Sequence, residues 1–413
     1  MTRLPPTSPR EIIFLPNIFE LVDRIKEIES SLFNQLGRWG DNPDELDPSL
    51  PGSVDNPTAE FINDAGNDAF IFKRLASKRY SLKPNLKEHR FIFRGQNKPY
   101  SKIQSSFERR SQDEKLISNL KYADFQFLLQ SHPLFMLFDR GIVLSPLKHP
   151  VFIEMNYYGL AQHYGFNTGL IDFTTDISVA AFFATTRYLG NDTYEPITDT
   201  REYPVGVIYI HGIKPKLTFK TCYRAIGLQV FPRTAKQKGL FFEESTPFSC
   251  EDTVEAFYFR HDPNLSIQIY NEMDKGARLF PEDMLAPYAQ EIINGNIISG
   301  RAFASNLFVN PQDEMQENLN RVRNAGHDVD FRKSWMFTED MLDPYYKEIK
   351  HGLWESFCDH VFFGGDYGGE IKDSLLSLPK RQEYKQYFDR RFFPQLQYHA
   401  LSNWERNKRN SVK

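Results

Sequence analysis

The sequence predicts an α+β fold, in which a mixed two-sheet core is flanked by helical regions near both ends of the chain. Apolar residues recur every three or four positions near the N-terminus, which indicates an amphipathic helix. Short aromatic and β-branched runs fill the middle of the chain and indicate strands. From about residue 283 onward the helical pattern returns. With 413 residues and 40% hydrophobic content, the chain is long enough to bury a large core.

We expect three regions along the chain. Residues 1–57 hold one helix and an acidic, proline-rich linker, because the segment 41–57 carries four prolines. Residues 58–290 form the central domain, and residues 291–413 form a helical C-terminal region.

The helices are predicted from apolar periodicity and from capping residues. Asn17 is the expected cap of the first helix, since it precedes the periodic segment directly. The predicted helices cover residues 18–36, 59–75, 112–130, 152–163, 177–188, 284–294, 318–325, 335–350 and 382–406.

The strands are predicted from short apolar runs that end at glycine or polar residues. The segment 191–204 between two such runs reads as a loop. The predicted strands cover residues 91–93, 205–211, 217–223, 239–242, 257–259 and 267–269.

Charge and cysteine content exclude several classes of protein. The net charge of −4 is close to neutral for this length, which excludes a whole-molecule polyelectrolyte role. Cys222, Cys250 and Cys358 are far apart, so neither a disulfide framework nor a metal site is expected. There is no apolar signal core and no run of about 20 apolar residues, so we expect a cytoplasmic protein with no membrane partner.

The first stretch with chemical potential is FIFRGQ, residues 91–96. An arginine at the end of an apolar strand needs a partner, and the planar guanidinium of Arg94 suits a phosphate or a carboxylate. Gly95 would let a ligand approach the backbone, with Gln96 beside it. The structural alternative is that a core carboxylate such as Asp172 satisfies Arg94.

The second stretch, residues 162–186, is dense in polar groups within apolar sequence. Buried polar groups need partners, so we expect these side chains to form one network. The alternatives are that His163 is structural and that Thr175 or Asp176 only caps the following helix. The candidates in this stretch are Gln162, His163, Tyr164, Asp172, Thr174 and Thr175.

A third stretch, residues 231–244, places Arg233 and Gln237 before a glycine and an aromatic strand. It can equally be a surface loop that leads into a strand. Phosphate-loop, dinucleotide-fingerprint, HExxH and GxSxG patterns are all absent from the chain.

Taken together, these motifs resemble the FRG-domain family over about residues 70–290. The resemblance is carried by Phe-Arg-Gly-Gln, by Ala-Gln-His-Tyr-Gly with Leu-Ile-Asp-Phe-Thr and Ala-Ala-Phe-Phe-Ala, and by Arg-x-x-x-Gln-x-Gly-Leu-Phe. Residues 279–283 fit the closing pattern of that family. One departure is Gly169 after Thr168, where members of the family usually have Thr-Arg-Leu-Leu-Asp.

A more distant similarity, to ADP-ribosyltransferases of the Arg-Ser-Glu type, implies a mechanism. It implies an ADP-ribosyltransferase-like core with NAD in a cleft between two sheets, where Arg94 and Thr174 face each other. Gly239 occupies the place of the usual catalytic Glu. The implied catalytic residues are Arg94, His163, Asp172, Thr174 and Gln237, and the implied NAD-binding residues are Arg94, Gly95, Gln96, Gln162, Tyr164, Thr174, Thr175 and Arg233.

The partners follow from the same resemblance and from basic clusters. FRG-like proteins are similar to toxins of bacterial toxin–antitoxin and phage-defence systems, which implies an antitoxin partner. Basic and aromatic residues in 73–90, 214–224 and 390–409 suit nucleic acid, with RNA as the favoured acceptor. The alternative is a non-enzymatic nucleotide- or phosphate-sensing module, which the missing Glu favours.

Overall fold

The computed structural model divides the chain into two compact units. The first comprises residues 1–67, 83–118 and 158–294, and the second comprises residues 68–82, 119–157 and 295–413. The residues described are 13–36, 70–74, 80–84, 89–132, 135, 142–143, 150–151, 155–212, 223–225, 231, 233–243, 254–281, 283–309, 315–338 and 361–362. The three cysteines lie outside these residues.

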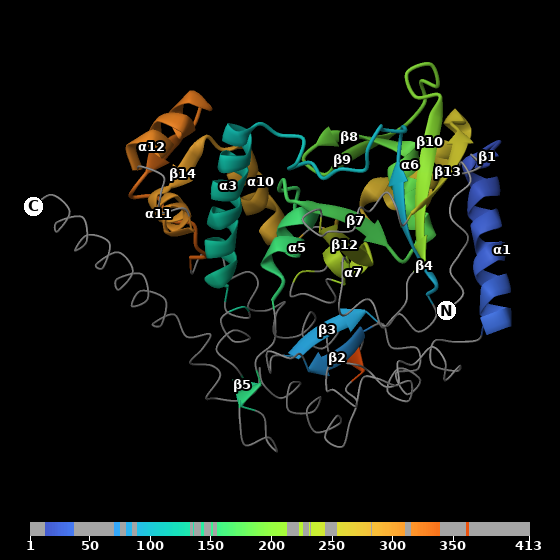
Figure 1. The fold of residues 1–413 in the computed structure, drawn as a ribbon, viewed down its shortest axis with the longest axis horizontal. Helices are drawn as coiled ribbons and strands as arrows, with labels where there is room; N and C mark the ends of the chain where they lie inside the picture. Colours follow the sequence, from blue (N-terminus) through green and yellow to red (C-terminus); the bar gives the residue numbers. More distant parts are fainter. Residues whose placement is uncertain are drawn as a thin grey trace, which may run out of the picture. The chain divides into compact units, whose positions relative to one another are not determined.

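A seven-stranded mixed sheet is the centre of the first unit (Figure 1). Only β1 and β13 run parallel, and all other neighbours pair antiparallel. The fold is therefore α+β, as predicted, but its core is one mixed sheet. In spatial order the strands are β1 (Ile13–Leu15), β13 (Glu255–Arg260), β10 (Val205–Gly212), β4 (Phe91–Gln96), β7 (Leu170–Thr174), β12 (Gly239–Glu243) and β11 (Tyr223–Ala225).

The sheet is nearly divided between β4 and β7. Six residue pairs join β10 to β4, and five join β12 to β7. A single pair, Phe93 with Thr174, joins β4 to β7. Two ladders thus meet along one narrow seam, which we call the β4–β7 seam.

One face of the sheet is covered by helices. The helix α6 (Ile177–Thr185) packs on β4 and β10, and α1 (Ile18–Leu36) contacts both α6 and β13 (Figure 1). Seven of the nine residues of α6 are buried, because the helix itself carries small and apolar side chains on nearly all of its sides. Asn17 caps α1 as predicted, since its Oδ1 accepts hydrogen bonds from the amides of Phe19 and Glu20.

The opposite face carries a second apolar cluster. Alternation along the strands places every second side chain on this face. The cluster comprises Ile92, Ile103, Ile171, Phe173, Val207, Tyr209, Leu240, Phe242 and Val254. We call this side of the sheet the Ile92 face.

Several element predictions are wrong, and for one of them the local reason is clear. Residues 70–74, expected to be helical, form the strand β2 (Phe70–Arg74). Residues 267–269, expected as a strand, lie within α9 (Pro263–Glu272), because Asp262 caps that helix and Pro263 occupies its first turn. The helix expected over 177–188 ends at Thr185.

A hairpin follows α6 where a loop was expected. The strands β8 (Thr186–Gly190) and β9 (Thr193–Pro196) pair antiparallel. Asn191 and Asp192 form the turn with φ values of 48° and 58°, in the left-handed region that tight hairpin turns require.

The second unit contains small sheets and helices. Its strand pairs are β14 (Ile297–Ser299) with β15 (Asp328–Asp330), β5 (Ile142–Val143) with β6 (Pro150–Val151), and β16 (Val361–Phe362) with β2, which also pairs with β3 (Tyr80–Pro84). Within this unit the buried carboxylate of Asp124, on α3 (Gln112–Gln130), accepts a hydrogen bond from the amide of Ser299 at 3.1 Å. Ser299 directly precedes α11 (Gly300–Val309).

The C-terminal predictions are met in part. The prediction over 318–325 is confirmed by α12 (Met315–Asn324), and the one over 284–294 by α10 (Leu285–Asn294) in the first unit. Residues 335–338 are not helical, and the remainder of that prediction, like 382–406, lies outside the described residues. Within the described part of the chain, no helix has the length and apolar character needed to span a membrane.

Candidate functional site

Arg94 lies on β4 at the β4–β7 seam. Its Nη1 donates to the main-chain carbonyl of Asp172 at 2.9 Å. Where strands separate, a carbonyl loses its ladder partner, and here a side chain supplies the donor. The partner is thus the main chain of Asp172 and not its carboxylate, which was the predicted structural alternative. The Nε of Arg94 is buried without a hydrogen-bond partner.

Gln96 shares a face of the sheet with Arg94. Because side chains alternate along a strand, both residues project to the Ile92 face. The Oε1 of Gln96 is also buried without a hydrogen-bond partner. One donor and one acceptor two positions apart on the same strand thus lack partners.

Gly95 projects to the helical face and makes room for α6. A Cβ atom at this position would lie 1.8 Å from the carbonyl oxygen of Ala180 and 2.8 Å from the amide nitrogen of Ala184. The glycine was expected to admit a ligand, but helix backbone occupies this space.

Thr174 lies on the opposite face of the sheet from Arg94. Directly paired residues share a face, so Thr174 lies with Phe93, and the adjacent Arg94 points the other way. The prediction that Arg94 and Thr174 face each other across one cleft is therefore wrong. The hydroxyl of Thr174 donates to the carbonyl of Gln237 at 2.8 Å and accepts from the amide of Asp176 at 3.1 Å.

Gln162 links the end of α5 (Tyr157–His163) to the strand β7. Its Nε2 donates to Oδ2 of Asp172 at 2.7 Å, and its Oε1 accepts from the hydroxyl of Thr168. Asp172 keeps one oxygen, Oδ1, that is buried without a partner. The expected network exists here, and both ends of the Gln162 amide are engaged in it.

His163 belongs to the same face and is held by Gln237. The His163 Nδ1 lies 2.7 Å from Oε1 of Gln237, whose Nε2 donates to the carbonyl of Leu279 at 3.1 Å. Because the amide oxygen can only accept, Nδ1 carries the proton. Burial lowers the pKa of His163, so the imidazole is neutral near pH 7 and its Nε2 is a buried acceptor without a partner.

Arg233 and Tyr164, both predicted to bind NAD, form a closed polar cluster. The guanidinium carbon of Arg233 lies 4.4 Å from the centre of the Tyr164 ring. Arg233 Nη1 donates to Asp192 at 2.7 Å, and Arg233 Nε lies 3.5 Å from Asp283. The Tyr164 hydroxyl donates to Asp283, and burial together with this carboxylate raises the pKa of Tyr164.

The binding role expected of Arg233 and Tyr164 stays a prediction, but the cluster engages the polar groups of both side chains internally. Arg233 is 3% exposed and Tyr164 is fully buried, so neither presents its polar group to the surface. Burial raises the pKa of Asp283, whose other oxygen accepts from the amides of Leu285 and Ala286 at the start of α10.

Thr175 and Asp176 complete the turn into α6. The amide of Thr175 donates to the carbonyl of Lys238 at 3.3 Å. Asp176 is the cap, because its Oδ1 accepts from the amide of Ser178 at 2.9 Å. The Asp176 carboxylate also pairs with the Lys238 Nζ at 2.9 Å, which lowers the pKa of Asp176 against the opposing effect of burial.

Sequence reasoning missed Asp192 as a member of the polar cluster. Its only local signal is the Asn-Asp pair, which indicates a turn and says nothing of a partner 41 residues away. Asp283 was noted only as part of a family pattern, and its capping of α10 could have been inferred from its position before the helix.

The predicted NAD-binding residues do not form one surface. Thr174 and Arg94 lie on opposite faces, and Tyr164, Arg233 and Gln237 are engaged internally. Gly239, which the resemblance places where a catalytic Glu is expected, pairs directly with Thr174. The residues therefore do not share the one surface that was predicted, and their binding of NAD stays a prediction.

The comparisons with known proteins give one finding. No curated protein and no solved structure shows significant similarity to this chain. The family model of the FRG domain matches residues 89–193, which include β4, α5, β7, α6 and β8. Residues 89–193 of this chain are an FRG domain.

Proposed function

We propose that the FRG domain is a binding module for a nucleotide or a related phosphorylated small molecule, held at Arg94 and Gln96 on the Ile92 face. The observation that carries the proposal is the pair of buried polar atoms without partners, Arg94 Nε and Gln96 Oε1. Leaving such atoms unsatisfied costs about 1–3 kcal/mol each, so a bound partner gains by pairing with them.

The chemistry of the two atoms defines the ligand class. Arg94 Nε is a donor on a cation and suits a phosphate oxygen, whereas Gln96 Oε1 accepts from a hydroxyl or amino group. The two residues are two positions apart on a strand, which is about 7 Å. A nucleotide carries phosphate oxygens and hydroxyl or amino donors at separations of this order.

The Arg94 guanidinium is held in place by a hydrogen bond, and apolar side chains lie on the same face of the sheet. The bond from Arg94 Nη1 to Asp172 anchors the guanidinium, so less side-chain freedom is lost when a ligand binds. Phe173 and Tyr209 belong to the apolar cluster on the same face. Both Arg94 and Gln96 are half-buried, so neither side chain is fully sealed in the core.

The test is calorimetric titration of the full chain with ATP, AMP, NAD and inorganic phosphate. Arg94→Lys keeps the charge but removes the fork, and we expect about a tenfold loss of nucleotide affinity. The matched control is Arg24→Lys on α1, an exposed arginine paired with Glu27, which should bind as the wild type does. No binding by the wild type, or equal loss in both variants, would contradict the proposal.

A second candidate is NAD-dependent ADP-ribosyl transfer to nucleic acid by a toxin held in check by an antitoxin. One observation favours it: β4, β7 and β12 are neighbours, so Arg94, Thr174 and Gly239 lie on adjacent strands in the order the resemblance implies. Release of nicotinamide from NAD by the purified protein, lost in Arg94→Lys, would support this candidate over simple binding. An unchanged NAD pool together with tight nucleotide binding would support the binding module.

A further inference from the structure

A strip of alternating aromatic and basic side chains lies at one end of the central sheet. We infer that this aromatic–basic strip binds single-stranded nucleic acid. Its members are Phe14, Arg260, Tyr203, Lys98, Tyr100 and Arg109.

Strand register brings these residues together from distant parts of the chain. Gln96 at the end of β4 pairs with Val207 near the start of β10, and Val205 pairs with Arg260 at the end of β13. The start of β10 and the ends of β4 and β13 therefore lie at the same end of the sheet. Lys98 follows β4 by two residues, and Tyr203 precedes β10 by two residues.

The ring–cation contacts form two groups at this end of the sheet: Tyr203, Lys98, Tyr100 and Arg109 in one, and Arg260 with Phe14 in the other. Lys98 Nζ lies 5.6 Å from the ring centre of Tyr100 and 5.7 Å from that of Tyr203. The guanidinium carbon of Arg109 lies 5.9 Å from the Tyr100 ring, and that of Arg260 lies 5.7 Å from the Phe14 ring. Such distances are within the range of cation–π attraction, which holds each cation beside a ring.

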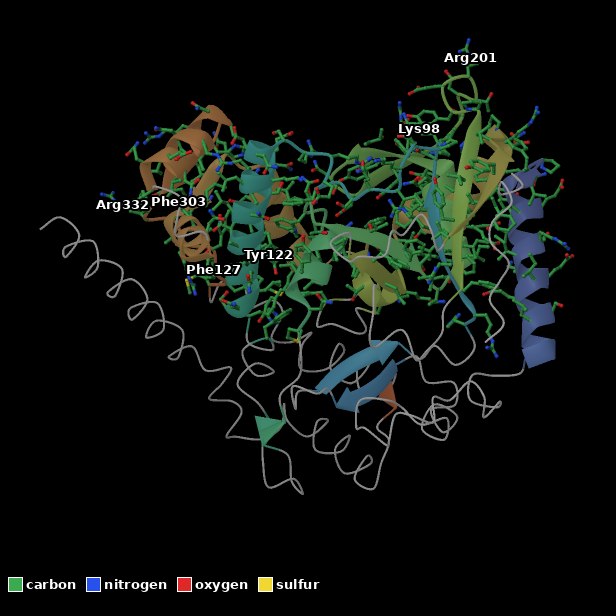
Figure 2. All side chains as sticks on the ribbon, viewed as in Figure 1. Lys98, Tyr122, Phe127, Arg201, Phe303 and Arg332 are labelled. Carbon is green, nitrogen blue, oxygen red and sulfur yellow. The ribbon has the colours of Figure 1, made fainter. Side chains whose placement is uncertain are left out.

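Two of the three rings are exposed to solvent, and Tyr203 is half-buried. Phe14 is 45% exposed and Tyr100 is 43% exposed, unlike most large aromatic side chains in this unit. Lys98 and Arg109 are exposed as well. In Figure 2, Lys98 lies on the same side of the molecule as Arg201, which marks the loop before β10.

The charge of the strip is positive because the nearby carboxylates have partners elsewhere. Within the described part of the chain, no carboxylate forms an ion pair with Lys98, Arg109 or Arg260. The nearby acidic groups are engaged as follows: Glu108 with Lys115, Glu114 with Arg110, Asp199 with Arg201, Glu202 with Arg187, and Asp262 with the amides that begin α9.

This combination matches an unpaired strand of nucleic acid. Exposed rings stack with bases, which is worth about 1–3 kcal/mol per base, and cations between the rings contact the phosphates. A duplex hides its base faces, and an anionic lipid surface offers no bases to stack. The whole chain carries a net charge of −4, so the attraction depends on this local surface.

Binding is tested on the full chain by fluorescence anisotropy with a labelled 12-nucleotide single-stranded RNA and the matching DNA. Tyr100→Ala should weaken binding roughly 5- to 150-fold, whereas Tyr100→Phe should retain it, because stacking requires only the ring. Lys98→Ala with Arg109→Ala should reduce the slope of log Kd against log salt by about 1.4, or 0.7 for each lost cation.

Matched controls take exposed residues that make none of the ring–cation contacts of the strip. Tyr188 is a comparably exposed tyrosine at 51%, and Arg24 and Lys26 are exposed cations on α1, so Tyr188→Ala and the pair Arg24→Ala with Lys26→Ala should bind as the wild type does. Thermal unfolding confirms that each variant is folded.

Four outcomes would overturn the inference: no strand binding by the wild type, equal loss in the control variants, equal affinity for a duplex of the same length, or preference for phosphatidylserine vesicles. The strip shares no residue with the Arg94–Gln96 site. Failure of nucleotide binding would therefore leave this result interpretable by itself.

Discussion

At the scale of the residue, Gly95 is the clearest case in which one side chain decides a contact. Gly95→Ala places a Cβ 1.8 Å from a helix carbonyl that cannot rotate away, so α6 must shift from β4. We expect a loss of more than about 3 kcal/mol of unfolding free energy, measured by urea denaturation.

The control for this prediction is Gly169→Ala. The nearest atom to a Cβ at Gly169 is the Tyr158 hydroxyl at 3.5 Å, an ordinary contact distance. That variant should lose less than about 1 kcal/mol. A similar loss in both variants would show that glycine content, rather than the close approach of α6, determines the effect.

Single residues were predictable from sequence where a local rule applies. Asn17 and Asp176 cap helices as their positions indicate, and the polar density of residues 162–175 does produce a buried network. The partners could not be predicted, because His163 meets Gln237 across 74 residues through strand pairing. The face of Arg94 depends on a register that a one-residue slip would reverse.

At the scale of the element, α6 depends on Asp176 at its N-terminus. Asp176→Ala removes the cap and the ion pair with Lys238, and we expect a loss of about 0.5–2 kcal/mol in chemical denaturation. Asp176→Asn retains a capping oxygen but no charge, and should lose less than the alanine variant. Equal losses in the two variants would assign the effect to charge instead of capping.

The same Asn variant has a second readout in α1. Burial, and to a smaller extent the charge of Asp176, raises the pKa of Glu29 to about 7. Removing that charge should lower the pKa of Glu29, which NMR titration of its carboxyl carbon would measure.

Elements with strong periodicity were predicted well, and elements that depend on a cap or a turn were not. The limits of α3 are those predicted over 112–130, whereas α9 was mistaken for a strand because Ile267 and Ile269 alternate. The cap Asp262 with Pro263 outweighs that alternation. The β8–β9 hairpin was missed because its signal is an Asn-Asp turn without glycine at its centre.

At the scale of the whole molecule, buried carboxyl groups make stability depend on pH. Burial raises the pKa of Asp124 from 3.8 to about 6. Between these pH values the folded protein keeps a proton on Asp124 that the unfolded chain has released. The contribution of Asp124 to the free energy of unfolding therefore falls as pH rises from about 4 to about 6. Below pH 4 both states are protonated, and the contribution no longer changes.

Asp124→Asn should therefore reduce the slope of the unfolding free energy against pH. From pH 4 to pH 7 the variant should lose about 1–3 kcal/mol less unfolding free energy than the wild type in urea denaturation. Asp328→Asn, at a carboxylate that is 70% exposed in the same unit, should keep the slope of the wild type. Parallel curves for wild type and Asp124→Asn would contradict the prediction.

The α+β class follows from the sequence because strand-like and helix-like periods occupy different parts of the chain. The division into units does not, since each unit is assembled from segments that are far apart in sequence. The FRG-domain match covers residues 89–193, which hold the β4–β7 seam but not β12 or β10. The strands that flank the seam are thus supplied by the rest of the chain.

The β4–β7 seam has a mechanical consequence. One residue pair and one arginine side chain join a six-pair ladder to a five-pair ladder, so the seam is where the sheet offers the least resistance to twisting or pulling. We therefore expect the sheet to separate between β4 and β7 before either ladder does, which pulling experiments on the two ladders would test. The two ladders would then move as two rigid bodies joined at one residue pair and one side-chain hydrogen bond.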